Sequence, residues 1–204
     1  MNRRYNPFLS LILAATLATG SCSPLGIAIG AGASAGIAAT EERGIEGTAK
    51  DATIRFKISE LWLDQGLDFY HALEMQIYEG RVLLSGQVPT QTMADTAVRL
   101  AWQPEGVVEV INEIVVRDGD LTAIATDTLT ATRLRTELTF TKGVQAINYS
   151  IRVVDGTVYL IGVAQDKDEL DRVIRTARAL SGVRDIVSHV WLKDDPRRTG
   201  KDGK

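Results

Sequence analysis

The hydrophobic and polar positions of this chain follow the same course twice. Apolar residues first recur at helical spacing, at Ile54, Ile58 and Trp62. This is the spacing of one apolar helix face. Leu134 and Leu138 stand 76 positions after Ile58 and Trp62, and they repeat the pattern. The two stretches predict one amphipathic helix at the start of each half, and a fixed offset of this kind indicates one structural unit used twice.

Each predicted helix is followed by the pattern of a β-hairpin. Apolar and polar residues alternate over eight positions, which is the period of a half-buried strand. Glu79-Gly80 and Asp155-Gly156 then interrupt the alternation, and such pairs favour tight hairpin turns because type I′ turns need positive φ. We expect the strands at residues 72–79, 81–88, 147–154 and 157–164.

A second helix and a third strand complete each half. Pro89-Thr90 and Asp166-Lys167-Asp168 carry helix-start signals, since Thr and Asp accept hydrogen bonds from the first free amides. Gly106 and Gly182 follow as terminators. The last strands are expected at residues 108–116 and 184–192. The chain is therefore predicted to be an α+β protein with two tandem αββαβ domains, at residues 50–118 and 122–193.

The two halves differ in charge. The chain has 204 residues and a net charge of −3, a length that fits two small domains. Residues 50–118 hold 6 Lys and Arg against 11 Asp and Glu, whereas residues 122–193 hold 10 against 8. A basic patch on the second half would suit phosphate groups of lipid or nucleic acid. A solvated surface without a partner is the alternative.

The N-terminus resembles an export signal. Arg3 and Arg4 precede an apolar run of 11 residues, 8–18. This run is shorter than the roughly 20 residues that span a bilayer, but it fits the core of a signal peptide over residues 1–21. The only cysteine, Cys22, follows, and a single cysteine forms no internal disulfide.

Residues Thr19 to Cys22 resemble the lipobox of bacterial lipoproteins, although the family prefers Leu at the position of Thr19. The resemblance implies that Cys22 is acylated after cleavage. The Gly/Ala-rich segment 22–49 is expected to be a tether, because glycine disfavours a helix in water; a position in the lipid interface beside the anchor is the alternative. Ser23 resembles the class destined for the outer membrane. Simple secretion, with cleavage after Ala33-Ser34-Ala35, is the alternative.

The repeated Gly-x-Val-x-Leu-x-Gly blocks, Gly80–Gly86 and Gly156–Gly162, resemble those of the BON domain family. The Gly-Val pairs before the last strands extend the resemblance to residues 54–117 and 127–193. It implies, for each domain, a small three-stranded mixed sheet with two helices packed on it. The whole layout resembles dual-BON outer-membrane lipoproteins linked to envelope integrity. That subgroup is associated with binding of anionic phospholipid through the second domain.

The first helix of the second domain carries the predicted lipid-binding residues. Arg133, Arg135 and Lys142 supply positive charge near the apolar Leu129 and Phe140. Basic side chains beside an apolar edge suit an anionic membrane surface. The subgroup often places an aromatic residue at the position of Leu129. We therefore expect an anionic phospholipid membrane as partner, on the periplasmic face of the outer membrane, with N-terminal acyl chains as the anchor.

Two alternatives apply to this region. Leu134, Leu138 and Phe140 would also serve as ordinary core residues, because apolar helix positions usually do. The chain would also serve as a protein-interaction or scaffolding module, since each domain exposes strand edges that a partner strand can pair with. An envelope protein partner belongs to this second hypothesis.

The sequence offers no catalytic signature. It lacks zincin, nucleophile-elbow, phosphate-loop and clustered Cys/His motifs, so we expect neither an enzyme nor a cofactor or metal site. His189 is expected on a strand facing solvent, and residues 166–171 at a solvated acidic helix start. A basic stripe at residues 172, 175 and 178 has the same interpretation. Export argues against nucleic acid, and the polar tail 194–204 is expected to be disordered.

Overall fold

The computed structural model describes residues 39–117 and 121–199. All of these residues belong to one compact unit. The predicted signal peptide, Cys22 and the tether up to residue 38 lie outside the described residues, as does the end of the tail, 200–204.

The first domain has the predicted order of elements with one short helix added. Its elements are α2 (Gly44–Leu63), α3 (Leu67–Ala72), β1 (Leu73–Tyr78), β2 (Arg81–Val88), α4 (Gln91–Ala101) and β3 (Glu109–Val116). Strand β2 pairs antiparallel with β1 and parallel with β3, so the sheet is mixed, in the order β1-β2-β3. The parallel pair requires a crossover, which α4 supplies.

The second domain repeats this topology. Its elements are α5 (Leu121–Phe140), the 3₁₀ turn η1 (Ala146–Asn148), β4 (Tyr149–Val154), β5 (Thr157–Ala164), α6 (Lys167–Ala179) and β6 (Asp185–Leu192), followed by the 3₁₀ turn η2 (Pro196–Thr199). The sheet order is β4-β5-β6, again antiparallel and then parallel. The predicted fold class, two tandem αββαβ domains with three-stranded mixed sheets, is confirmed.

Two of the predicted helix-start signals act as caps. The Thr90 side chain accepts a hydrogen bond from the Met93 amide at the start of α4, and Asp166 accepts one from the Glu169 amide at the start of α6. The glycines that end the repeated blocks permit a close approach of two strands. A side chain on Gly162, which has φ +148°, would lie on the carbonyl oxygen of Asn148.

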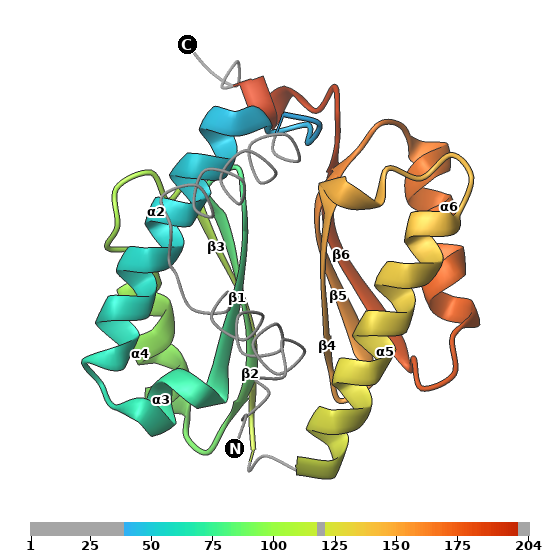
Figure 1. Cartoon of the computed structure of the whole chain (residues 1–204). Helices are drawn as coiled ribbons and strands as arrows, with labels where there is room; N and C mark the ends of the chain where they lie inside the picture. The colour runs from blue at the N-terminus through green and yellow to red at the C-terminus, as the bar shows by residue number, and fades with distance from the viewer. Residues whose placement is uncertain (1–38, 118–120, 200–204) are drawn as a thin grey trace, which may run out of the picture. The chain divides into compact units, whose positions relative to one another are not determined.

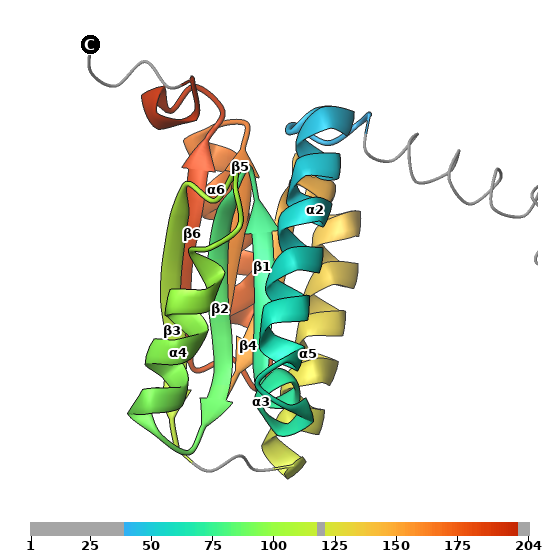
Figure 2. The same ribbon diagram turned by 90° about the vertical axis from the view of Figure 1, so that its left-hand side faces the viewer.

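Each sheet is covered by helices on one face and by the other sheet on its second face (Figure 1, Figure 2). The helix-facing side chains form one core per domain. The opposite faces form a third cluster, which contains Tyr78, Leu83, Val154, Tyr159, Ile161 and Val163. The prediction that the first strand of each domain is half-buried is wrong for Gln76, Tyr78 and Val154, because this second face is also covered.

The predicted end of the tether and the predicted start of the disordered tail both require correction. The tether was predicted to end at residue 49, but α2 already begins at Gly44, after Arg43 has bonded Asp51 and the carbonyl of Ile77. These tertiary contacts outweigh the low helix propensity of the glycines. The tail was predicted to be disordered from residue 194, but η2 is ordered there and Arg198 pairs with Glu79.

Candidate functional site

A buried carboxylate joins the first helix of each domain to the hairpin turn. Asp51 accepts hydrogen bonds from the amides of Glu79 and Gly80, at 2.9 and 2.8 Å. Asp127, 76 positions later, accepts them from the two corresponding turn amides at 2.6 and 2.9 Å. Both lie beyond the first turn of their helices, so they bind the hairpin turn and not the amides of a helix N-terminus.

Ion pairs of one polarity connect the domains. Four carboxylates from the first domain and its leading segment face basic side chains of the second domain and its tail. Three are ion pairs, Glu42–Lys193 (3.2 Å), Glu74–Arg152 (2.5 Å) and Glu79–Arg198 (2.6 Å), and the fourth contact is a hydrogen bond between Glu113 and His189 (2.8 Å). One pair has the opposite polarity, Arg117–Asp155 at 2.9 Å. The difference in charge between the two halves is therefore used in part to join them.

The contact between Glu113 and His189 reveals the symmetry of the interface. These residues are 76 positions apart and occupy the same place in the two repeats. Two copies related by a two-fold axis bring a residue onto its own equivalent only near that axis. The domains therefore pack with approximate two-fold symmetry. His189 was predicted to face solvent, but its side chain is only 23% exposed and contacts the other domain.

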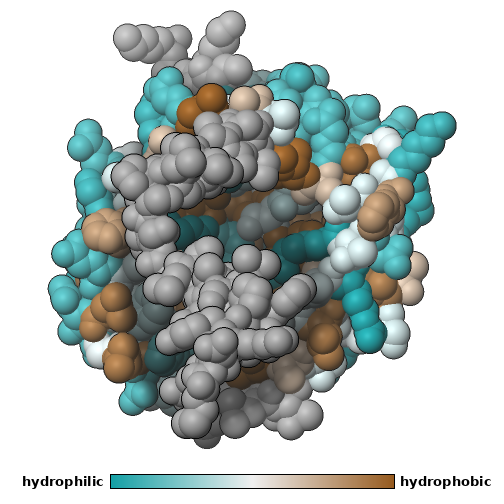
Figure 3. All heavy atoms as spheres, in the orientation of Figure 1, coloured by the Kyte–Doolittle hydropathy of each residue, from teal (hydrophilic) through white to brown (hydrophobic). Residues whose placement is uncertain are grey.

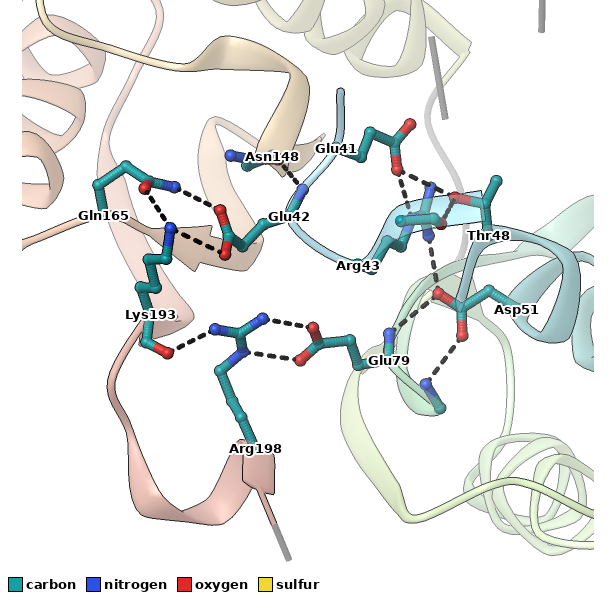
Figure 4. A network of polar contacts seen from close by, with 12 residues as sticks. Glu41, Glu42, Arg43, Thr48, Asp51, Glu79, Asn148, Gln165, Lys193 and Arg198 are labelled. Carbon is teal, nitrogen blue, oxygen red and sulfur yellow. Dashed lines mark hydrogen bonds and ion pairs between the residues drawn. The ribbon is translucent and has the colours of Figure 1, made fainter. Parts of the chain in front are cut away.

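The segment before α2 reaches across to the second domain (Figure 4). The Glu42 carboxylate accepts hydrogen bonds from the Gln165 amide group at 2.9 Å and pairs with Lys193 at 3.2 Å. The Glu42 backbone amide donates to the Asn148 side chain at 2.8 Å. Burial alone would raise the pKa of Glu42, but the hydrogen bonds from Gln165 and Lys193 lower it. This segment ties the start of the first domain to the second.

The segment after β6 reaches back to the first domain. Arg198 forms a bidentate pair with Glu79, at 2.9 and 2.6 Å, and this hydrogen bonding raises the pKa of the guanidinium. Arg198 also donates to the carbonyl of Lys193 at 2.6 Å (Figure 4). Bidentate pairs of this geometry are the stronger class of surface ion pair. The two ends of the described unit are thus each held by the opposite domain.

Trp191 anchors the same edge of the interface. The Arg81 guanidinium lies 3.8 Å from its ring centroid, and Arg197 lies 4.6 Å from it. Arg81 also donates to Glu109 at 2.6 Å and to the carbonyl of His189 at 2.8 Å. Burial lowers the pKa of Arg81 despite these partners. The Arg81 guanidinium is therefore held by protein groups on its edge and on its face.

Three of the five predicted lipid-binding residues lie along one exposed stripe of α5. Leu129 is 59% exposed and Phe140 is 83% exposed. Arg133, also exposed, stands four residues after Leu129 and seven before Phe140, and these spacings place all three on one helix face. Leu134 and Leu138 are fully buried on another face. The core interpretation is therefore confirmed for Leu134 and Leu138 and wrong for Phe140.

The other two predicted residues lie elsewhere. Arg135 leaves the stripe and donates to the carbonyl of Ile151 on strand β4, at 2.6 Å. Lys142 follows the end of α5 and is exposed in the turn before η1. The predicted set thus divides into a stripe on α5, an arginine over a strand edge, and a lysine beyond the helix.

An arginine that the sequence analysis missed occupies the equivalent place in the first domain. Arg55 on α2 donates to the carbonyl of Met75 on β1, at 2.9 Å. Met75 and Ile151 are 76 positions apart, and β1 and β4 are edge strands. Arg55 and Arg135 therefore bind corresponding carbonyls on the two strand edges, although they come from different turns of their helices. Arg55 gave no signal in the sequence because its role depends on the edge beside it.

Two adjoining grooves lie along these edges, between α2 and α5. The first, of about 290 Å³, includes Arg55 in its lining, and the second, of about 550 Å³, includes Arg135. Both are also lined by Ile147 and Tyr149, so they meet at these residues. Figure 3 shows a hollow on this face, in which hydrophobic and hydrophilic residues lie next to one another. Helix α2 also exposes apolar side chains, among them Phe56 at 70%.

The described residues contain neither a metal-binding cluster nor a membrane-spanning helix. Within residues 39–117 and 121–199, no group of three or more His, Cys, Asp or Glu side chains is placed to hold a metal ion. No helix within the same ranges combines the length and the apolar character needed to cross a membrane.

Comparison with known proteins agrees with this architecture. The model of the BON domain matches residues 50–118 and 126–193. The outer membrane lipoprotein DolP of Haemophilus influenzae is 30% identical over 181 residues, which cover 88% of this chain and 92% of DolP. An uncharacterized protein in the gshII 5′ region of Anaplasma centrale is 35% identical, over 72% of this chain and 98% of its own length.

The osmotically-inducible protein Y of Escherichia coli shares a shorter region. It is 31% identical over 115 residues, which cover 55% of this chain and 57% of that protein. Two matches to the family model, two copies of one αββαβ topology and a relative that aligns over most of both chains agree. The chain belongs to the BON domain family and carries two BON domains in tandem.

Proposed function

We propose that this protein is a non-enzymatic lipoprotein of the bacterial envelope that binds anionic phospholipid through helix α5. In this proposal Cys22 carries the acyl anchor, which holds the protein at the periplasmic face of the outer membrane, where it helps to maintain the envelope. The relative named an outer membrane lipoprotein, aligned over 92% of its length, supports the location. The exposed stripe of Leu129, Arg133 and Phe140 supports lipid binding.

Phe140 is the observation that carries the proposal. A phenylalanine that is 83% exposed at the end of a helix contributes nothing to the core, and aromatic side chains favour the interface of a bilayer. Arg133 adds about 1 kcal/mol of attraction when it lies near an anionic membrane surface. Glu137 on the same helix is also exposed and opposes part of this attraction. The contact is therefore weak alone and depends on the anchor for effective concentration.

The test of lipid binding uses the full chain with Cys22→Ser, so that no acyl group contributes. The second domain alone is unsuitable, because its sheet face packs against the first domain. We expect cosedimentation with phosphatidylglycerol vesicles that weakens with salt and with Phe140→Ser or Arg133→Gln. Arg175→Gln on α6 is the control, since it removes the same charge from an exposed helix position. Equal binding to phosphatidylcholine vesicles, or full binding by both stripe variants, contradicts the proposal.

The anchor is tested separately. The wild-type chain should incorporate a palmitate analogue and fractionate with membranes, and Cys22→Ser should abolish both. Label that persists in the Cys22→Ser variant would show that the anchor lies elsewhere or is absent.

A further inference from the structure

We infer that the two adjoining grooves between α2 and α5, together called the groove, bind the phosphate group of an anionic phospholipid. Arg55 would contact it from the first groove and Arg135 from the second. This inference rests on the proposed function and adds a second site to it, one that both domains build. It differs from the stripe on α5, which contacts the membrane through Leu129 and Phe140.

The groove holds two guanidinium groups that form no ion pair with a described residue, those of Arg55 and Arg135. Arg43 lines it but is paired with Glu41 and Asp51, while Asp51 is itself occupied by the hairpin amides. Arg55 and Arg135, in contrast, have no carboxylate within ion-pair distance among residues 39–117 and 121–199. Burial lowers the pKa of Arg55 and the nearby charge of Arg43 lowers it further, whereas Asp51 and Glu74 act in the opposite direction.

Both arginines retain donors for a ligand. Each spends one terminal nitrogen on a strand carbonyl, at 2.9 Å for Arg55 and 2.6 Å for Arg135. A guanidinium carries five N–H donors in a planar fork, and this fork matches the oxygens of a phosphate. The carbonyl contact fixes each guanidinium at the edge of the groove, so that less side-chain freedom is lost when an anion binds.

Part of the remaining lining is apolar and suits the glycerol and acyl part of a lipid, beside polar side chains such as Thr48, Ser150 and Gln145. Ile77 and Tyr78 line the first groove, Ile151 lines the second, and Ile147 and Tyr149 line both. Ile147 is 40% exposed. Binding sites for small amphiphiles combine an apolar lining with a few placed polar groups in this manner. A free anion would use the arginines but would leave the exposed side chain of Ile147 in water.

The chain enters the described unit at the same groove. Thr40 lines the second groove, and residues 23–39 separate it from Cys22, the proposed anchor. Helices α2 and α5 flank the groove, and both helices lie on the side of the sheets where β1 and β4 form the edge (Figure 2). Phe56 on α2 and Phe140 on α5 are exposed. These features favour a lipid of the membrane in which the anchor resides over a soluble anion.

The experiment measures vesicle binding by full chains that carry Cys22→Ser together with a groove substitution. Arg55→Gln and Arg135→Gln should each weaken partitioning onto phosphatidylglycerol vesicles about fivefold, the loss that about 1 kcal/mol for each basic side chain corresponds to. Arg55→Lys, which keeps the charge but not the fork, should lie between parent and Arg55→Gln. Arg175→Gln on α6 should change partitioning by less than about twofold.

A second measurement, the thermal midpoint of unfolding with and without a short-chain lipid, tests the inference even if a variant is less stable. Dihexanoyl phosphatidylglycerol below its micelle concentration should raise the thermal midpoint of the parent, and inorganic phosphate at equal concentration should raise it less. Arg55→Gln should remove most of the lipid-induced shift. An equal shift from inorganic phosphate would identify an anion site without lipid preference and would overturn the inference.

The outcomes separate the two sites. If Arg55→Gln binds vesicles as the parent does while Phe140→Ser and Arg133→Gln lose binding, the groove inference is wrong and the proposed function stands. If Arg55→Gln and Arg135→Gln lose binding while the stripe variants do not, the groove is the lipid site and the stripe is not. If the parent binds no anionic vesicle and no short-chain lipid, both proposals fail.

Discussion

Ile161 offers the sharpest test of whether the two domains hold together. It lies on β5, is 0% exposed, and belongs to the cluster that joins the two sheets, with Tyr78 and Leu83 of the first domain. Its neighbour Leu160 is equally buried but points into the core of the second domain, beneath the helices. Adjacent strand residues point to opposite faces, so these two residues report on the two packing surfaces separately.

The expected magnitudes differ between the two arrangements. Truncating a fully buried isoleucine or leucine to alanine costs about 2–5 kcal/mol, so Ile161→Ala and Leu160→Ala should both fall in this range if the sheets pack together. If the domains were independent, Ile161 would face water. Its truncation would then cost no more than about 0.5 kcal/mol, as at other surface positions. Leu160→Ala would remain costly in either case.

The measurement is urea denaturation of the full chain, followed by circular dichroism. We expect one transition for the parent and a loss of about 2–4 kcal/mol in the free energy of unfolding for Ile161→Ala. Val116→Ala, a partly exposed position on β3, is the control and should cost less than about 0.5 kcal/mol. A cost of about 0.5 kcal/mol or less for Ile161→Ala, beside a large cost for Leu160→Ala, would refute the packing of the domains.

Two further predictions concern the contacts that hold the turn and the interface. Asp127→Ala removes the acceptor of two turn amides and should lower the free energy of unfolding by about 2–5 kcal/mol, since each buried donor left unpaired costs about 1–3 kcal/mol; a loss below about 1 kcal/mol in urea denaturation would contradict this role. The pKa of Asp155 is lowered, first by its hydrogen bond from Arg117, and the pKa of Glu42 is lowered as described above. Carboxylates with lowered pKa stabilise the folded state fully above their unfolded pKa, and this stability is lost as the pH falls through the folded pKa. The urea concentration at the midpoint of unfolding should therefore decrease as the pH is lowered below about 4.5, near the ordinary glutamate value. Glu42→Gln should make this decrease smaller. The same dependence on pH in the variant and the parent would rule out a part for Glu42.

The fold within each domain could be predicted because it depends on local signals. Helical spacing at Ile54 and Ile58, alternation along the strands, and the pairs Glu79-Gly80 and Asp155-Gly156 each act within a few residues. The structure bears this out, since Glu79 and Asp155 adopt the positive φ that the turns require. Element order follows directly from such signals.

The packing of the sheets could not be predicted, because the face of the first sheet that meets the second domain carries polar residues. Gln76, Ser85 and Gln87 occupy the face that meets the second domain, and alternating polar residues of this kind indicate a solvated strand face. The side-chain oxygens of all three lie buried without a hydrogen-bond partner within the described part of the protein. A pattern that distinguishes polar from apolar positions contains no information on which polar face is covered.

The site was predictable in part. Phe140 stands two positions after Leu138, which places it on the opposite side of a helix that buries Leu138, so its exposure could have been derived from spacing alone. Arg135 stands only one position from the core residue Leu134, and nothing in the sequence indicates that it reaches a strand carbonyl. Its contact depends on the distance between α5 and β4, which only the tertiary structure supplies.

Net charge alone does not identify the arginines that remain available to an anionic ligand. The first domain is acidic, yet its Glu74 and Glu79 face cations of the second domain or its tail, and its Glu113 contacts His189. Such pairs neutralise much of the charge difference that had suggested a basic binding surface on the second domain. What remains for a ligand is set by which arginines have no carboxylate, and Arg55 of the acidic domain is among them. If the proposed groove binds anionic lipid, the site would draw on both repeats.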